Sequence, residues 1–169
     1  MQDHVLASLT AAARTLPASG ILEVFNYGLG RPGLIPLWAG EGDLPTPGFI
    51  CEAAVRSLRA GETFYTAGRG IQPLREALAS YTGRVYGQAF AADEFFVVGG
   101  GMQAIQLAAQ AVAGPGDEIV VPTPAWPNFA GAIMGQGAKA VSVPMALTST
   151  GWTLPLDRLF AACGARTRA

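Results

Sequence analysis

From residue 94 onward, short apolar runs alternate with segments of helical periodicity. The runs 94–98, 118–122 and 139–144 are strand-like, and helical patterns follow them at 102–113, 126–137 and 154–163. Strands that are apolar on both faces are typical of a parallel sheet covered by helices. The β-α-β-α-β-α order therefore predicts an α/β fold with a mostly parallel sheet and helices on both of its faces.

The part of the chain before residue 94 has a different pattern, with helices separated by segments rich in glycine and proline. Thr46 is suited to an N-cap and Pro47 to the first helical position. This part predicts a helix over 3–16, an extended arm with little regular structure over 17–48, a helix from Thr46-Pro47 to Gly61, a loop at TFYTAGRG and a helix over 72–86.

Composition excludes several classes of partner. The formal net charge is −1 and no basic stripe is present, which argues against nucleic acid. Gly and Pro interrupt every long uncharged stretch, so no bilayer-spanning helix is expected. The N-terminus lacks the basic and apolar regions of a secretory signal, which predicts a cytoplasmic protein. Only 14% of residues are charged, so the chain carries more apolar surface than it can bury alone.

Residues for metal or triad chemistry are scarce. Cys51 and Cys163 are far apart and predict free, buried thiols in a reducing compartment. His4 is the only histidine, so we expect neither a metal site nor a Ser-His-Asp or Cys-His triad. Lys139 is the only lysine.

Three consecutive glycines, 99–101, separate the first strand-like run from a helix. A helix N-terminus presents unpaired N–H groups and a partial positive charge, and glycine lets an anion approach them. The turn at 99–101 is therefore a candidate phosphate-binding site, which we call the phosphate seat. The alternative is a tight turn that glycine merely permits.

The literal match to G-x-G-x-x-G lies elsewhere, at Gly28–Gly33. No buried strand precedes it and Pro32 lies within it, so the context of a dinucleotide site is missing. A G-x-x-x-x-G-K-[ST] loop is absent from the sequence.

Two aromatic residues are further candidates. Trp126 follows the second strand-like run, where ligands collect in open α/β sheets, and its indole could stack on a flat ring. Tyr65, in a Gly-rich loop, could reach a phosphate oxygen. The alternatives are a core or interface Trp126 and a surface or subunit-contact Tyr65.

Four stretches, taken in order, resemble the N-terminal half of the class I/II aminotransferases, which are pyridoxal 5′-phosphate (PLP) enzymes of fold type I. The resemblance runs from about residue 17 to the last residue. It rests on WAGEGDLPTPGFICEAA, GETFYTAGRGIQPLREALASY, VVGGGMQAIQLAAQAVAGPGDEIVVPTPAWPNF and GWTLPLDRLFAACGARTRA.

The resemblance implies a role for each candidate. Gly101 and Met102 would bind the PLP phosphate through backbone N–H groups, and Trp126 would stack on the pyridine ring. Tyr65 would reach the phosphate of the neighbouring subunit, which implies a homodimer. Gly40 would lie near the substrate carboxylate. Residues 1–45 would form an N-terminal helix and arm, part of the small domain, and 46–169 a truncated N-terminal portion of the large domain.

The implied reaction transfers an amino group between an amino acid and a 2-oxo acid. In the family the Schiff-base lysine lies beyond residue 169, and Lys139 is not expected to replace it. No catalytic residue is therefore predicted in this chain, which we expect to be an inactive and poorly soluble fragment when made alone. Two alternatives stay open: a non-catalytic PLP- or phosphate-binding remnant or partner subunit, and a Rossmann-type dinucleotide-binding domain.

Overall fold

The computed structural model describes residues 4 and 7–169, which form two compact units. The first unit consists of Met1–Ala39 and Gly100–Ala169, and the second of Gly40–Gly99. Each unit has its own helices, and the two are described separately below.

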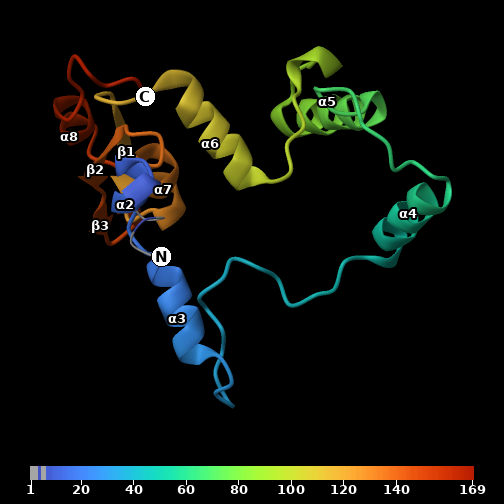
Figure 1. The fold of residues 1–169 in the computed structure, drawn as a ribbon, viewed down its shortest axis with the longest axis horizontal. Coiled ribbons are helices and arrows are strands. Elements are labelled where there is room, and N and C mark those ends of the chain that lie inside the picture. The colour runs from blue at the N-terminus through green and yellow to red at the C-terminus, as the bar shows by residue number, and fades with distance from the viewer. Residues whose placement is uncertain (1–3, 5–6) are drawn as a thin grey trace. The chain divides into compact units, whose positions relative to one another are not determined.

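The centre of the first unit is a pair of parallel strands, β1 (Glu118–Thr123) and β2 (Lys139–Pro144). They pair from Glu118 opposite Lys139 to the ends of both strands. Helix α7 (Pro127–Met134) connects them and packs against both (Figure 1). Both strands were predicted within a residue or two, and the α/β class with parallel pairing is confirmed.

Helix α6 (Gly101–Val112) packs against α7. The core between these helices and the strands is small: Ile133 is the largest buried side chain in it. The other buried members are alanines, with three partly buried neighbours; the cluster comprises Ala109, Ala113, Ile133 and Ala138, joined by Ile119, Val121 and Ala140. A core of this size leaves much apolar surface exposed.

The chain after β2 forms a short hairpin and a last helix. Strands β3 (Ala146–Thr148) and β4 (Gly151–Thr153) pair antiparallel, and α8 (Leu156–Ala161) follows. The hairpin was not predicted; Gly151 has a φ of 115°, a left-handed conformation that suits glycine at this turn. Helix α8 lies within the predicted range of 154–163.

The N-terminal segment differs from the prediction. The helix expected over 3–16 is interrupted at residues 9 and 10, where Thr10 caps α2 (Ala11–Thr15); residues 3, 5 and 6 of that prediction lie outside the described part. The extended arm expected over 17–48 is wrong in part, because α3 occupies Gly20–Gly28. Between these two glycines the sequence has no helix-breaking residue, and its aromatic and aliphatic side chains favour a helix that packs on Trp38.

Trp38 lies against the end of α3. Its ring meets Phe25 edge-on, with ring centroids 6.0 Å apart, and it covers Gly28 so closely that a β-carbon there would overlap the indole. Gly28 is therefore needed for close packing.

The second unit contains α4 (Gly48–Arg59), α5 (Gln72–Tyr86) and a 3-10 turn, η1 (Ala92–Glu94). Helix α4 begins one residue later than predicted, with Pro47 at the N-cap position. Helix α5 has the predicted bounds and ends at the left-handed Gly87. Arg75 joins α5 to η1 through an ion pair of 2.9 Å with Asp93.

The strand predicted over 94–98 is wrong. Glu94 ends η1, and residues 95–98 form no β-ladder with any described residue; the backbone N–H of Val97 instead donates to the carbonyl of Arg69 at 3.1 Å. Gly70 faces the Val97 side chain, and a β-carbon at Gly70 would overlap it. A strand needs a neighbouring strand, and this run has none among the described residues.

Among the described residues, no helix has the length and apolar character needed to cross a bilayer.

Candidate functional site

The glycine turn leads directly into α6. Gly100 occupies the N-cap position with an extended backbone, φ 169° and ψ 164°, and no side chain caps the helix. Extended backbone suits any residue, so conformation does not explain this glycine. A β-carbon at Gly100 or Gly101 would meet no heavy atom within 4 Å. The turn therefore leaves open space in front of the first amides of α6, including those of Gly101 and Met102.

The electrostatics of this helix end favour an anion. The first turn of α6 contains no acidic residue, so no carboxylate of that turn offsets the positive end of the helix dipole. With twelve residues, α6 is long enough for its aligned peptide dipoles to act at its end. A phosphate is an anion of the kind that helix N-termini bind.

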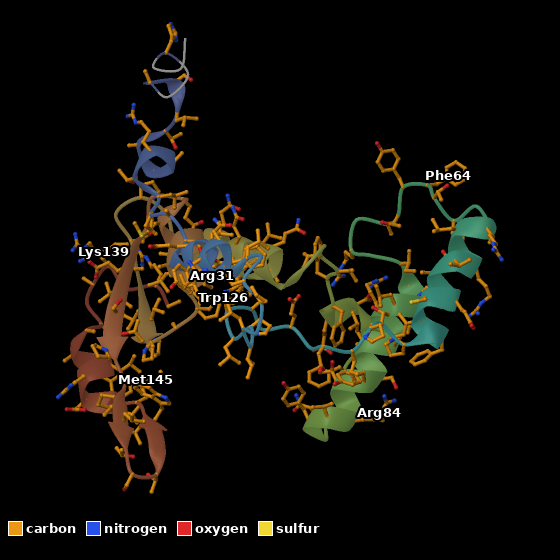
Figure 2. All side chains as sticks on the ribbon, turned by 90° about the horizontal axis from the view of Figure 1, so that it is seen from below. Arg31, Phe64, Arg84, Trp126, Lys139 and Met145 are labelled. Carbon is orange, nitrogen blue, oxygen red and sulfur yellow. The ribbon has the colours of Figure 1, made fainter. Side chains whose placement is uncertain are left out.

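Trp126 is positioned by the turn after β1. It occupies the N-cap position of α7, and Pro127 opens the helix. Its indole lies edge-on to the Phe129 ring, with centroids 5.7 Å apart and planes at 86°. The Trp126 side chain is labelled in Figure 2, and 43% of the residue is exposed. The indole thus contacts Phe129 and is partly open to solvent.

The helix end and the indole belong to neighbouring elements. Ile105 of α6, Phe129 of α7 and Pro122 of β1 line one groove. The second turn of α6 and the first turn of α7 therefore both lie beside β1. Helix α7 begins just after the carboxyl end of β1, the edge at which open α/β sheets bind ligands.

Tyr65 and Gly40 lie in the second unit, so Gly101, Met102 and Trp126 are the candidates that share one unit. Tyr65 is fully exposed, in a loop between α4 and α5. A hollow of about 590 Å³ beside it is lined by that loop and the start of α5. Gly40 is exposed, and a β-carbon there would meet no atom within 4 Å.

The G-x-G-x-x-G match has no dinucleotide-binding context. Gly28 ends α3 instead of following a strand, and Gly30 and Gly33 are left-handed turn glycines. Since Gly28 packs on Trp38, its role in the fold is steric.

Lys139 lies at the other end of the strands. It pairs with Glu118 in the first position of β2, and its Nζ lies 3.4 Å from the Glu118 carboxylate. Trp126 follows the carboxyl end of β1, and the two side chains lie apart in Figure 2.

Glu118 and Asp117 anchor the C-terminal segment, a feature that sequence reasoning missed. Arg166 Nη2 lies 2.9 Å from Glu118 Oε1, and Arg168 Nε lies 2.9 Å from Asp117 Oδ1. The hydrogen bond from Arg168, together with one from the Gly114 N–H, holds the pKa of Asp117 below its usual range. No spacing rule links residues so far apart in the sequence.

Cys51 and Cys163 are free, as predicted, but the prediction that they are buried is wrong, because both are exposed. The described residues contain no group of histidine, cysteine, aspartate and glutamate that could hold a metal ion.

Comparison with protein families gives a match over most of the chain. The sequence profile of the aminotransferase class I and II family matches residues 32–166. An aspartate aminotransferase of Rhizobium meliloti is 33% identical over 164 residues, 92% of this chain and 40% of the relative. One from Streptomyces avermitilis is 36% identical over 163 residues, 96% of this chain and 37% of the relative.

Solved structures agree. The crystal structure of the Rhizobium meliloti aspartate aminotransferase superposes with a TM-score of 0.85 at 32% identity, over 95% of this chain and 41% of that one. The Thermotoga maritima aspartate aminotransferase gives a TM-score of 0.82 at 30% identity, over 94% and 43%. The chain thus spans about 40% of the length of these relatives.

Proposed function

We propose a function for this chain from one premise: it belongs to the class I and II aminotransferase family. The resemblance read from the four sequence stretches is confirmed, and so is the fold class, a partial fold type I transferase. The family is enzymatic and in general PLP-dependent. Because the chain spans about 40% of its relatives, the activity of a whole enzyme is part of the proposal.

The chain is the N-terminal part of a PLP-dependent aminotransferase and supplies the cofactor's phosphate seat. The observation that carries this is the N-terminus of α6, which follows the glycine turn without a side-chain cap and with open space at Gly100 and Gly101. PLP, when bound, supplies the electron sink for transfer of an amino group between an amino acid and a 2-oxo acid. The relatives named above are aspartate aminotransferases, so aspartate is the first amino donor to test.

Each candidate residue has one task in this proposal. The N–H groups of Gly101 and Met102 donate to the phosphate, and the exposed face of Trp126 stacks on the pyridine ring. Tyr65 donates its hydroxyl to the phosphate held by a neighbouring subunit of a homodimer. Gly40 leaves room for the substrate carboxylate.

This chain supplies no lysine to hold PLP covalently. Its single lysine, Lys139, pairs with Glu118 at the amino end of the strands. The chain alone is therefore expected to bind PLP through the phosphate and ring without transferring amino groups. A phosphate-binding remnant, or a subunit whose partner supplies the lysine, is the second candidate and uses the same seat.

The test is a titration of the chain with PLP, followed by equilibrium dialysis, with inorganic phosphate as competitor and NAD as a contrast. In the variant Gly101→Asp, a carboxylate enters the first turn of α6. There its negative charge interacts favourably with the helix dipole, so the variant should still fold. The same charge repels the phosphate group, so PLP binding should fall.

The matched control is Gly48→Asp. Gly48 is the first residue of α4, also twelve residues long, and a β-carbon there likewise meets no atom within 4 Å. Loss of PLP binding in the first variant alone supports the phosphate seat. Equal PLP binding by both variants, or tight binding of NAD that depends on Gly101, contradicts it.

A further inference from the structure

Residues 95–98, here called the entry run, lead from η1 into the phosphate seat, and Arg69 holds the chain at two points there. The Arg69 guanidinium donates a hydrogen bond from Nη2 to the backbone carbonyl of Asp93 in η1. The backbone carbonyl of Arg69 accepts the N–H of Val97 at 3.1 Å. A single residue thus holds the chain both at η1 and within the entry run.

Gly70 brings its backbone against the same point of the entry run. Its φ of 97° lies in the left-handed region that favours glycine, and a β-carbon there would lie 2.5 Å from Val97 Cγ2. The N–H of Gly70 donates to the carbonyl of Ala67 at 2.8 Å, which closes the turn before it. Backbone conformation and close contact therefore both favour glycine at this position.

Arg75 anchors η1 to the second helix of this unit. Its Nη1 lies 2.9 Å from the Asp93 carboxylate and 3.2 Å from the Ala92 carbonyl. The Arg75 side chain is only 11% exposed, whereas that of Asp93 is 82% exposed. The chain that precedes the phosphate seat is therefore supported by α5, a helix of fifteen residues, instead of by a neighbouring strand.

The entry run ends where the phosphate seat begins. Only Val98 separates Val97 from Gly99, the first residue of the seat. Consecutive glycines have a wide choice of backbone conformations, so their sequence alone does not fix the course of the turn. An anion-binding turn needs its N–H groups to converge on one point, and this requires a fixed approach to the turn.

We propose that Gly70, Arg69 and Arg75 position the phosphate seat. By holding Val97 and η1 they set the direction in which the chain enters the glycine turn, so that the N–H groups at the start of α6 bind phosphate together. They are positioning residues, which act through the entry run and not through contact with the cofactor. The inference rests on the proposed function and deepens it.

The first variant is Gly70→Ala, which drives a methyl group into Val97. Equilibrium dialysis measures its affinity for PLP and for pyridoxal, which has the same ring without the phosphate group. A displaced seat should lower the ratio of PLP affinity to pyridoxal affinity about tenfold. A chain that is merely less stable loses both affinities together, so its ratio stays the same.

The matched control is Gly61→Ala in the same unit. Gly61 is also left-handed, with a φ of 75°, but a β-carbon there would meet no atom within 4 Å. The control therefore has the same kind of backbone strain without the contact to the entry run. Its affinity ratio should equal that of the wild type.

A second variant, Asp93→Ala, keeps the test decisive if Gly70→Ala does not fold. It removes the carboxylate held by Arg75, at a side chain that is largely exposed. Loss of a negative charge would by itself favour an anion, so charge and positioning predict opposite changes. We expect the affinity ratio to fall about threefold, on the scale of a partly exposed ion pair.

Hydrogen exchange without ligand locates the change. The Val97 amide should exchange faster in Gly70→Ala than in the wild type or in Gly61→Ala. Faster exchange at Val97, with a lower affinity ratio in Gly70→Ala and Asp93→Ala alone, supports the inference. An unchanged ratio in either variant, a raised ratio in Asp93→Ala, an equal fall in Gly61→Ala, or unchanged exchange at Val97 overturns it.

The wild-type chain separates this inference from the proposed function. If the wild type binds PLP no more tightly than pyridoxal, the proposed phosphate seat fails, and the positioning inference fails with it. If the wild type prefers PLP and the Gly70→Ala and Asp93→Ala variants keep that preference, the positioning inference fails alone.

Discussion

Asp117 Oδ1 accepts a hydrogen bond of 2.9 Å from Nε of Arg168, which follows it 51 residues later in the chain. This contact and the neighbouring pair between Glu118 and Arg166 attach the C-terminal segment to the start of β1. The position of the C-terminal segment against β1 therefore depends on side chains as well as on backbone hydrogen bonds.

The first prediction concerns acid stability. The pKa of Asp117 is lowered in the folded chain, chiefly by the hydrogen bond from Arg168. A lowered folded pKa adds stability above the unfolded pKa, and this stability is lost as pH falls through the folded value. Arg168→Ala should thus reduce the melting temperature near pH 7, and the difference from wild type should shrink below about pH 4. Thermal unfolding between pH 2.5 and 7 measures it; a difference independent of pH would contradict the assignment.

The second prediction compares the two cations at Glu118. Glu118 is buried, and its Oε1 lies 2.9 Å from Arg166 but 3.4 Å from Lys139. Glu118→Ala should cost about 1–3 kcal/mol of unfolding free energy, because a charge-assisted hydrogen bond is lost. Double-mutant cycles in urea should give a larger coupling with Arg166 than with Lys139. The reverse order would show that the shorter contact is not the stronger one.

The third prediction tests the packing of Trp38 on α3. Gly28→Ala would drive a methyl group into the indole, and we expect a loss of about 1–3 kcal/mol, the usual effect of overpacking. The control is Gly20→Ala at the other end of α3, where a β-carbon meets no atom within 4 Å. That change should be neutral or slightly stabilising. Equal losses at both positions would point to the helix itself instead of the Trp38 contact.

The fourth prediction addresses the stacking role proposed for Trp126. Trp126→Ala should weaken PLP binding about tenfold, while Trp126→Phe should keep most of the affinity, since a phenyl ring still offers a face. Trp152→Ala, in the β4 strand, is the control because Trp152 is also exposed but belongs to the hairpin. Equilibrium dialysis with PLP avoids the mixed fluorescence of three tryptophans. Unchanged affinity in Trp126→Ala would remove the residue from the site.

The sequence predicted the elements whose stability is local. Helix α5, strand β1 and strand β2 were found from periodicity and flanking turn residues, whereas the phosphate seat before α6 stays a prediction. The strand over 94–98 was predicted wrongly. Its residues have the composition of a strand, but a strand forms only where a neighbouring strand pairs with it. Helix α3 was missed because the many glycines and prolines of residues 17–48 indicated an extended arm, although the residues between Gly20 and Gly28 favour a helix.

Contacts between distant residues could not be predicted in this way. Gly28 reads as part of a nucleotide motif, but its neighbour in space is Trp38. Asp117 reads as a turn residue and Glu118 as the first residue of β1, and only the folded chain brings Arg166 and Arg168 to them. Family resemblance supplied roles for Tyr65 and Gly40, which no local pattern would have given.

The two edges of β1 also find their partners at different stages of synthesis. On one edge Glu118 meets Lys139, 21 residues later, so the β1–α7–β2 unit can form soon after residue 144 leaves the ribosome. On the other edge the partner of Glu118 is Arg166, which is synthesised 48 residues later. During that interval the nascent chain exposes an unpaired apolar strand edge, which is the kind of surface that chaperones cover.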